Sequence, residues 1–285
     1  MSSSFSFFDL VPGKVLVDRY RILRPHRDTG IATALAVEDQ EDSSRAELQV
    51  YPAALFGDRE QAEQFAERLG AWLEVDHQAV LGLRKVQVLD DGTVLAISDF
   101  PTGASLRARM TDSARMDPDD AIALGRQILG GLGDIHAAGL VHGDIKPAAI
   151  YQGSDEGSAQ LIDGGVTSAL WAAKHLGTRT TLIGTPFYSP LEQFSGDSPS
   201  ASSDLYGLGT LLYELITGVL PWEGTGFIEV FQSKMQEAAP AMSLRAPGIE
   251  IQPALEAAIA GSLRAKRAER YVSADDFLMA LSSLG

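Results

Sequence analysis

The spacing of apolar residues changes along the chain, and this change constrains the fold more than any other feature. Over the first hundred residues apolar positions alternate, as in YRILRP (20–25) and ALAVED (34–39), a period typical of strands. One segment there, residues 58–75, has helical spacing instead. From Asp117 onward, helical stripes follow one another. The sequence therefore predicts a small sheet with one helix, followed by a mostly helical part.

The composition shifts near DFPTGAS (99–105), where we place a boundary. We expect an N-terminal extension over residues 1–19, a first lobe over 20–101 and a second lobe over 102–285. A chain of 285 residues is long enough for two lobes that share an interface.

The charge balance excludes several classes of function. The formal net charge is −15, so the chain is a poor partner for nucleic acids or anionic membranes. There is no cysteine, which excludes disulfides and thiolate metal sites. The first residues lack the features of a secretory signal, and no later run of about 18 apolar residues offers a bilayer span. We expect a cytoplasmic protein with no nucleic-acid partner and no membrane insertion.

Five motifs occur in the order that they have in protein kinases. They are HGDIKPAAI (142–150), IDGG (162–165), GTPFYSPLEQ (184–193), SDLYGLGTLLYELITGVLPW (203–222) and RAERYVSADDF (267–277). Together with the sheet-then-helix layout, they identify the chain as a degenerate member of the bacterial Hanks-type serine/threonine protein kinase family. The resemblance implies an α+β, bilobal kinase-like fold, with a small antiparallel-sheet N-lobe containing one main helix and a larger helical C-lobe.

The positions that would hold the nucleotide phosphates depart from the family pattern. The phosphate-covering turn HRDTGIAT contains a single glycine, Gly30, and is typical of an ordinary hairpin turn. The strand position of the phosphate-binding lysine is occupied by the neutral Gln49. Its partner glutamate is replaced by Arg68, and Glu67 lies one step around the helix. Three cations from neighbouring strands are candidates to replace the lysine, but strand parity disfavours them: Arg27, Arg45 and Lys85.

The catalytic loop retains part of the pattern. By resemblance, Asp144 orients the acceptor hydroxyl and Lys146 steadies the transferred phosphoryl group. Gly143 replaces the arginine that reads a phosphorylated activation loop. Ala149 replaces the asparagine that binds a second magnesium ion, and an alanine has no oxygen for a cation. The other reading is that Asp144 and Lys146 persist only as a hydrogen-bonded network within the loop.

In IDGG, Asp163 stands at the metal-binding position and could hold one cation, while Gly164 replaces the phenylalanine whose packing marks the active arrangement. Seven hydroxyls follow on an expected loop, either as ordinary polar residues or as substrates of another kinase: Thr167, Ser168, Thr178, Thr180, Thr181, Thr185 and Ser189.

The structural positions of the family are retained. His142 begins the catalytic-loop motif, and the resemblance implies that Asp204 accepts backbone N–H groups of that loop. Glu192 is expected to pair with Arg270. Three tryptophans are interpreted as core residues: Trp72, Trp171 and Trp222.

From the missing groups we predict a pseudokinase, a domain that is not an enzyme and that serves as a scaffold or regulator by binding proteins, such as an active kinase or a regulated assembly. We expect no cofactor. Two alternatives remain open. One is a weak or non-standard serine/threonine kinase that uses Asp144, Lys146 and Asp163 with weakly bound ATP and magnesium. The other is a module that senses ATP without turning it over.

Overall fold

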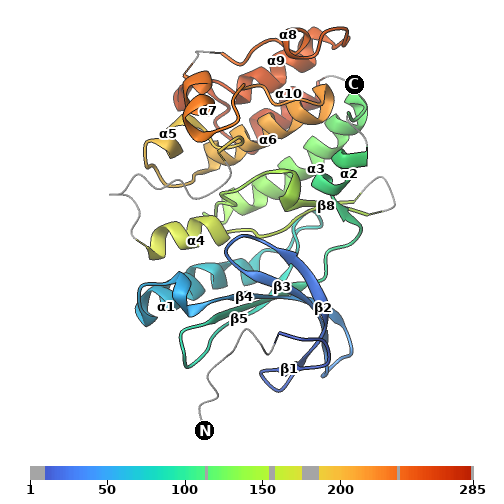
Figure 1. The fold of residues 1–285 in the computed structure, drawn as a ribbon. Helices are drawn as coiled ribbons and strands as arrows, with labels where there is room; N and C mark the ends of the chain where they lie inside the picture. Colours follow the sequence, from blue (N-terminus) through green and yellow to red (C-terminus); the bar gives the residue numbers. More distant parts are fainter. Residues whose placement is uncertain (1–9, 113–114, 154–157, 175–185, 236–237, 284–285) are drawn as a thin grey trace. The chain divides into compact units, whose positions relative to one another are not determined.

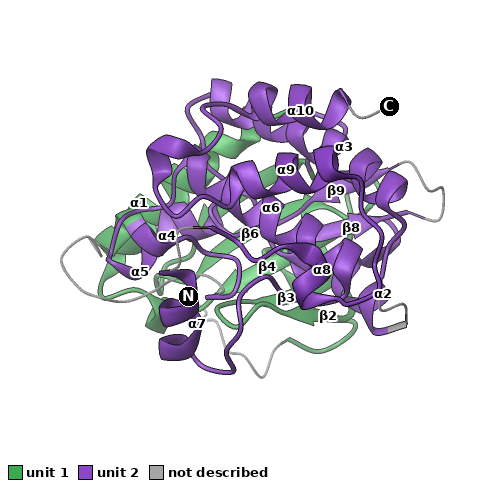
Figure 2. Cartoon of the chain, turned by 90° about the horizontal axis from the view of Figure 1, so that it is seen from above, with its two compact units in different colours: residues 1–76, 81–101, 172–175 green, residues 77–80, 102–171, 176–285 purple. Residues whose placement is uncertain are grey.

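The computed structural model describes residues 10–112, 115–153, 158–174, 186–235 and 238–283. These residues belong to two compact units, coloured separately in Figure 2. Unit 1 comprises residues 1–76, 81–101 and 172–175, and unit 2 comprises residues 77–80, 102–171 and 176–285.

A six-stranded antiparallel sheet is the main element of unit 1 (Figure 1). Its order is β1-β2-β3-β4-β6-β5. The strands are β1 (Val15–Leu16), β2 (Tyr20–Asp28), β3 (Thr33–Asp39), β4 (Arg45–Tyr51), β5 (Leu83–Val88) and β6 (Val94–Asp99). The pairing of β2 with β3 shifts register twice, between Ile22 and Arg24 and between Pro25 and Arg27.

The two faces of this sheet differ in character. Alternate residues of β4, Ala46, Leu48 and Val50, belong to a buried apolar cluster with residues of β2, β3 and β6. Because side chains alternate along a strand, Glu47, Gln49 and Tyr51 share the opposite face. The polar residues of β4 therefore lie together, away from that cluster.

Helix α1 (Arg59–Gly70) is the main helix of unit 1. Asp58 caps its N-terminus by accepting a hydrogen bond from the backbone N–H of Gln61. The helix buries Ala62, Phe65 and Leu69, which lie at the spacing that the sequence indicates. The Phe65 ring lies 5.0 Å from the ring of Tyr51, so α1 packs on the polar face of β4.

The second half of the chain is mostly helical. Its helices are α2 (Leu106–Asp112), α3 (Pro118–Ala137), α4 (Val166–Ala173), α5 (Leu191–Phe194), α6 (Ala201–Thr217), α7 (Phe227–Lys234), α8 (Met242–Arg245), α9 (Pro253–Ser262) and α10 (Ala274–Ser282). A small antiparallel sheet has the order β7 (Ala104–Ser105), β8 (Ile150–Gln152) and β9 (Ala159–Leu161).

Helix α6 is the most deeply buried element of unit 2. It begins with a capping box between Ser200 and Ser203 and ends at Gly218, whose φ of 77° is the left-handed conformation that glycine adopts readily. Helix α3 packs closely against both α6 and α10 at Gly125. A Cβ on this glycine would lie 3.1 Å from Leu281 on α10 and 3.2 Å from Leu212 on α6.

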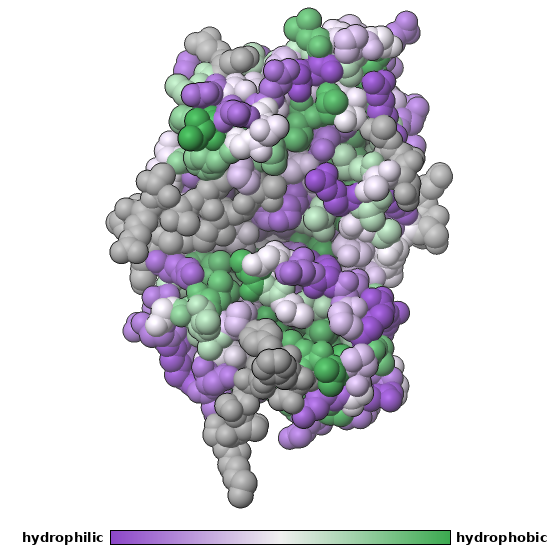
Figure 3. All heavy atoms as spheres, viewed as in Figure 1, coloured by the Kyte–Doolittle hydropathy of each residue, from purple (hydrophilic) through white to green (hydrophobic). Residues whose placement is uncertain are grey.

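Exposed apolar side chains on unit 2 include Phe227, Ile228 and Met235 in or beside α7 and Leu244 on α8. On the face in Figure 3, hydrophobic side chains over the helices of unit 2 stand in small groups between hydrophilic ones. Trp72, Trp171 and Trp222 are 5%, 5% and 4% exposed, so the prediction that they are core residues is confirmed. Among the described residues, no helix combines the length and apolarity needed to cross a bilayer.

Candidate active site

The catalytic loop lies between the end of α3 and strand β8. Lys146 donates a hydrogen bond from Nζ to a carboxylate oxygen of Asp144. The side chains are 26% and 18% exposed, so the pair remains in contact with solvent. A partly exposed carboxylate and ammonium on one short loop can take part in acid–base chemistry and in charge stabilisation.

Asp204, in the first turn of α6, holds this loop in place. Its carboxylate accepts the backbone N–H of His142 at 2.9 Å and the backbone N–H of Gly143 at 2.8 Å. The same carboxylate lies 3.0 Å from Nε2 of His136 on α3. Asp204 is 1% exposed, and burial makes these hydrogen bonds costly to lose. The loop is therefore anchored to two helices immediately before Asp144.

Gly143 occupies a backbone position that suits glycine alone. Its φ is +88°, and a Cβ there would lie 3.3 Å from atoms of Pro199, Thr167 and Ser168. The Ser168 hydroxyl donates to the Val141 carbonyl at 3.0 Å, which joins α4 to the start of the loop. The segment after Asp163 thus packs where a larger side chain at position 143 would begin.

Asp163 follows Ile162, whose backbone is hydrogen-bonded to the catalytic loop and to the residues just after it. The Ile162 N–H donates to the Ala149 carbonyl at 2.9 Å, and the Ile162 carbonyl lies 2.9 Å from His142 Nε2. Asp163 has a φ of 61°, a left-handed conformation that is uncommon outside glycine. Unit 2 therefore brings the sequence-predicted residues Asp144, Lys146 and Asp163 onto adjoining loops.

These residues fit one magnesium ion rather than two. Mg²⁺ in phosphoryl-transfer sites is bound by one or two carboxylates together with substrate phosphates. Asp163 supplies one carboxylate, whereas Ala149 is buried and has no oxygen in its side chain. In the part of the chain that the structure describes, no group of three or more His, Cys, Asp or Glu residues could hold a metal alone.

The hydroxyls after Asp163 do not all lie on a loop, and that expectation is wrong for two of them. Thr167 and Ser168 lie on α4, because the run Val166–Ala173 buries its apolar side chains. Ser189 is buried beyond that helix, with 6% of its surface exposed. The remaining candidates lie outside the described residues: Thr178, Thr180, Thr181 and Thr185.

In unit 1, Gln49 belongs to a buried polar network on β4. Its amide donates to Glu47 Oε1 at 2.9 Å and its carbonyl accepts the hydroxyl of Tyr51. Glu47 has no exposed surface. Its Oε1 also accepts a hydrogen bond from Arg27 Nη2 at 2.6 Å, and its Oε2 lies 2.6 Å from His26 Nδ1. Burial alone would raise the pKa of Glu47, but hydrogen bonds from His26 and Arg27 outweigh it and lower the pKa to about 2.

The position of Arg27 corrects the parity argument made from the sequence. Arg27 contacts Glu47 and therefore lies on the same face of the sheet as Gln49. β2 contains two register shifts, between Ile22 and Arg24 and between Pro25 and Arg27, and each reverses the face that the following side chains occupy. The two reversals cancel, so Arg27 lies on the face opposite to buried Ile22, as regular alternation would place it. The other two candidates behave differently: the Arg45 guanidinium lies 3.9 Å from the centre of the Phe100 ring, and Lys85 is exposed.

Glu47 is the residue that sequence reasoning missed. A carboxylate in the middle of the apolar run AELQV is the signal that could have found it, because a charge on a central strand needs a buried partner. Arg68 and Glu67 are exposed on α1, whose buried residues are apolar.

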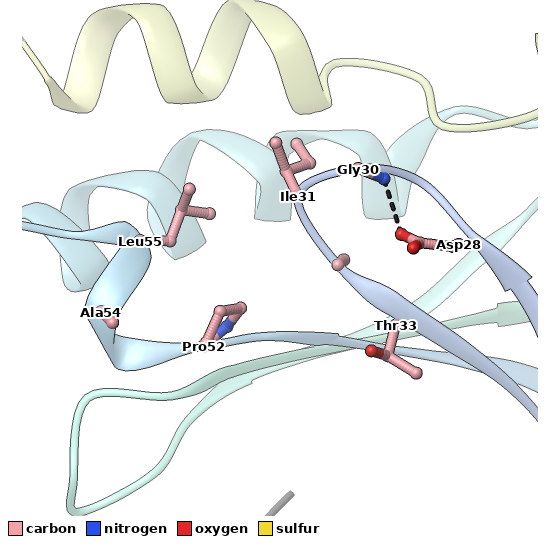
Figure 4. Close-up of a pocket in the computed structure, with 8 residues that line it drawn as sticks. Asp28, Gly30, Ile31, Thr33, Pro52, Ala54 and Leu55 are labelled. Atoms are coloured by element: carbon pink, nitrogen blue, oxygen red, sulfur yellow. Dashed lines mark hydrogen bonds between the residues drawn. The ribbon is translucent and has the colours of Figure 1, made fainter.

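The turn before β3 is closed by its own side chains. Gly30 has a φ of +81°, and its N–H donates to Asp28 Oδ1 at 2.8 Å. Figure 4 shows a hollow between this turn and the segment from Pro52 to Leu55. Ile31 and Leu55 contribute to its apolar lining. The backbone N–H that a phosphate would use at Gly30 is therefore engaged by a carboxylate.

A buried ion pair supports the lower part of the site. Arg270 donates from Nη1 to Glu192 at 2.6 Å and from Nη2 at 2.9 Å. Its guanidinium also lies 4.8 Å from the centre of the Tyr206 ring on α6. The pair expected from the resemblance is thus present, and through Arg270 it links α5 to the core helix α6.

The fold and these loops define a protein kinase domain, and comparison with known proteins places the chain in that family. A family model described as "Protein kinase domain" matches residues 55–275, so the chain belongs to the protein kinase family. The match begins after β4, the strand that carries Gln49.

The curated relatives are bacterial. The probable serine/threonine-protein kinase PknB of Lactococcus lactis is 26% identical over 93% of this chain and 42% of its own length. The serine/threonine-protein kinase PknL of Mycobacterium bovis is 28% identical over 93% of this chain and 65% of its own length. The chain therefore spans only part of each of these relatives.

A solved structure shares the fold. The kinase domain of Mycobacterium tuberculosis PknI superposes with a TM-score of 0.75 at 19% identity, covering 96% of this chain and 99% of that domain. The predicted α+β protein-kinase fold is confirmed.

The prediction that the chain is not an enzyme is contradicted. The relatives are named as serine/threonine-protein kinases, which points to an enzyme, and no finding shows catalytic inactivity. The sequence reading gave too much weight to missing side chains and too little to the loop that remains.

Proposed function

We propose that this chain is a non-standard serine/threonine protein kinase that transfers a phosphoryl group from ATP to a protein hydroxyl. One observation carries the proposal: Asp144 and Lys146 contact each other on a loop that buried Asp204 holds by two backbone N–H groups. Retention of this arrangement together with family membership favours catalysis over a purely structural role.

Each retained group has a chemical task in this proposal. The Asp144 carboxylate accepts a hydrogen bond from the acceptor hydroxyl and aligns its oxygen for attack. Lys146 places positive charge beside the transferred phosphoryl group, where charge develops in the transition state. Asp163 is the residue that would hold a magnesium ion, which supplies neutralisation of the phosphate charge when bound.

The departures from the family pattern set the expected rate. Gln49 carries no charge to place on the phosphates, and Ala149 offers no ligand for a second cation. Each such electrostatic contact is typically worth about 3 kcal/mol of transition-state stabilisation. We therefore propose a slow kinase whose acceptor is a protein. Since ATP is the donor, we propose the cytoplasm as the place of action.

The assay that tests this function measures transfer from magnesium ATP to a library of serine- and threonine-containing peptides. The proposal expects transfer by the wild-type chain and a loss of at least about a hundredfold in Asp144→Asn. Asp134→Asn, which changes an exposed aspartate on α3, is the matched control. Equal transfer by the wild type and by Asp144→Asn would reject the proposal.

The second candidate is a module that binds ATP without turning it over. The neutral Gln49 and the self-closed turn at Gly30 favour it, because both weaken the hold on the phosphates. A thermal shift with magnesium ATP that Asp163→Ala abolishes, without any transfer to peptides, would support this candidate instead.

A further inference from the structure

Lys234, the last residue of α7, is a buried cation with three backbone acceptors. It is 1% exposed, and its Nζ donates to the carbonyls of Pro186, Phe187 and Ser189 at 3.0, 2.8 and 2.6 Å. A protonated lysine has three N–H donors, so three carbonyls use its full capacity. One side chain thus fixes the backbone of residues 186–189, which we call the tethered segment.

Other charged and aromatic groups surround the ammonium. The rings of Tyr206 on α6 and Phe194 on α5 lie 5.1 and 5.7 Å from Nζ. Burial and the nearby Arg270 lower the pKa of Lys234 well below its ordinary value, whereas Glu192 raises it. The three carbonyls act in the opposite direction to burial and favour the charged form, since a neutral amine would leave one of them unsatisfied.

The tethered segment adjoins the catalytic loop. Gly207 of α6 lies close to both the tethered segment and the catalytic loop. A Cβ on Gly207 would lie 3.2 Å from the carbonyl oxygen of Ile145 and 3.7 Å from the carbonyl oxygen of Tyr188. Ile145 stands between Asp144 and Lys146 in the chain. A displacement of the tethered segment therefore changes the surface beside the two residues proposed to meet the acceptor.

The side chain of Tyr188 provides a second attachment. Its hydroxyl donates to Glu214 of α6, a carboxylate whose pKa is raised mainly by burial. This contact fixes one side chain, whereas Lys234 holds three carbonyls along the segment. Lys234 is therefore the contact that sets the course of the backbone.

We propose that Lys234 is a positioning residue for the acceptor protein: by tethering residues 186–189 it holds the surface on which the acceptor chain lies beside Asp144. The inference rests on the proposed kinase function. Lys234 acts through the backbone of that segment and does not touch the reacting atoms. No uncharged side chain of similar length can replace it, because none offers three donors from one atom.

The test is Lys234→Met, which keeps an unbranched apolar stem and removes the donors. We expect KM for an acceptor peptide to rise about tenfold, with a smaller change in kcat. We also expect faster hydrogen exchange at the backbone amides of residues 187–189. The matched control is Leu281→Ala on α10, a fully buried residue whose truncation destabilises unit 2 without touching the segment.

The outcomes separate the inference from the function on which it rests. A KM increase confined to Lys234→Met, with faster exchange in the tethered segment, supports the inference. An unchanged KM, or the same kinetic change in Leu281→Ala, overturns it. If the wild-type chain transfers nothing beyond Asp144→Asn, the kinase function is rejected, and unchanged exchange at residues 187–189 then rejects the tether independently.

Discussion

Arg27 on β2 donates to both carboxylate oxygens of Glu47 on β4, although β3 lies between the two strands. The carboxylate is fully buried, and Gln49 donates to it from the same strand. Where a kinase of the usual pattern carries a lysine, this chain therefore has a buried ion pair whose cation comes from a different strand.

Glu47→Gln should destabilise unit 1 in a pH-dependent way. The pKa of Glu47 is about 2 in the folded chain, below its ordinary 4.5, so its charge contributes stability above pH 4.5 that is lost as the pH falls toward 2. We expect the free energy of unfolding to drop by about 3 kcal/mol at pH 7. Urea titrations across this pH range should show the difference between wild type and variant shrinking in acid.

The control for that experiment is an exposed pair on α1. Arg59 and Glu63 are both more than half exposed, so Glu63→Gln should cost less than about 0.5 kcal/mol. An equal loss in the two variants would show that burial of Glu47 contributes nothing.

Gly209→Ala should disrupt the packing of α6 against α9. A Cβ at this position would stand 1.8 Å from Ser262 Oγ, and Ser262 is fully buried. We expect a loss of about 3 kcal/mol in the free energy of unfolding, measured in urea. Gly70→Ala on α1, where a Cβ meets nothing within 4 Å, should instead raise stability by about 0.5 kcal/mol.

Restoring the family arginine with Gly143→Arg should not restore a more typical kinase. The φ of +88° and contacts at 3.3 Å disfavour any side chain here. We expect a lower melting temperature and, in the peptide-transfer assay, no gain in rate. A variant that gains activity at unchanged stability would contradict the packing described for this loop.

Much of the fold could be predicted from local patterns. The stripe of Ala62, Phe65 and Leu69 predicted α1, and the cap at Asp117 with the following proline predicted the start of α3. These features depend on neighbours in sequence, which is why a single chain reveals them. The pairing of Glu192 with Arg270 was available only through the family resemblance.

The features that could not be predicted depend on contacts between distant segments. The strand order β2-β3-β4 and its register bring Arg27 to Glu47 across β3, and nothing in the local sequence marks that pairing. Lys234 ends a short helix, and a lysine is usually exposed to solvent, yet this one is buried and donates to three carbonyls more than forty residues away in the sequence. The sequence shows which family side chains are replaced, such as those at Gln49 and Ala149. It does not show how much these replacements affect catalysis when Asp144 and Lys146 are retained.

The most direct measurement of the central claim is phosphopeptide formation from magnesium ATP by the wild-type chain, Asp144→Asn and Asp134→Asn, followed by mass spectrometry. The account predicts slow, magnesium-dependent phosphorylation of serine or threonine by the wild type and by Asp134→Asn, and a loss of at least about a hundredfold in Asp144→Asn. Phosphopeptide yields that are the same in all three proteins would contradict it.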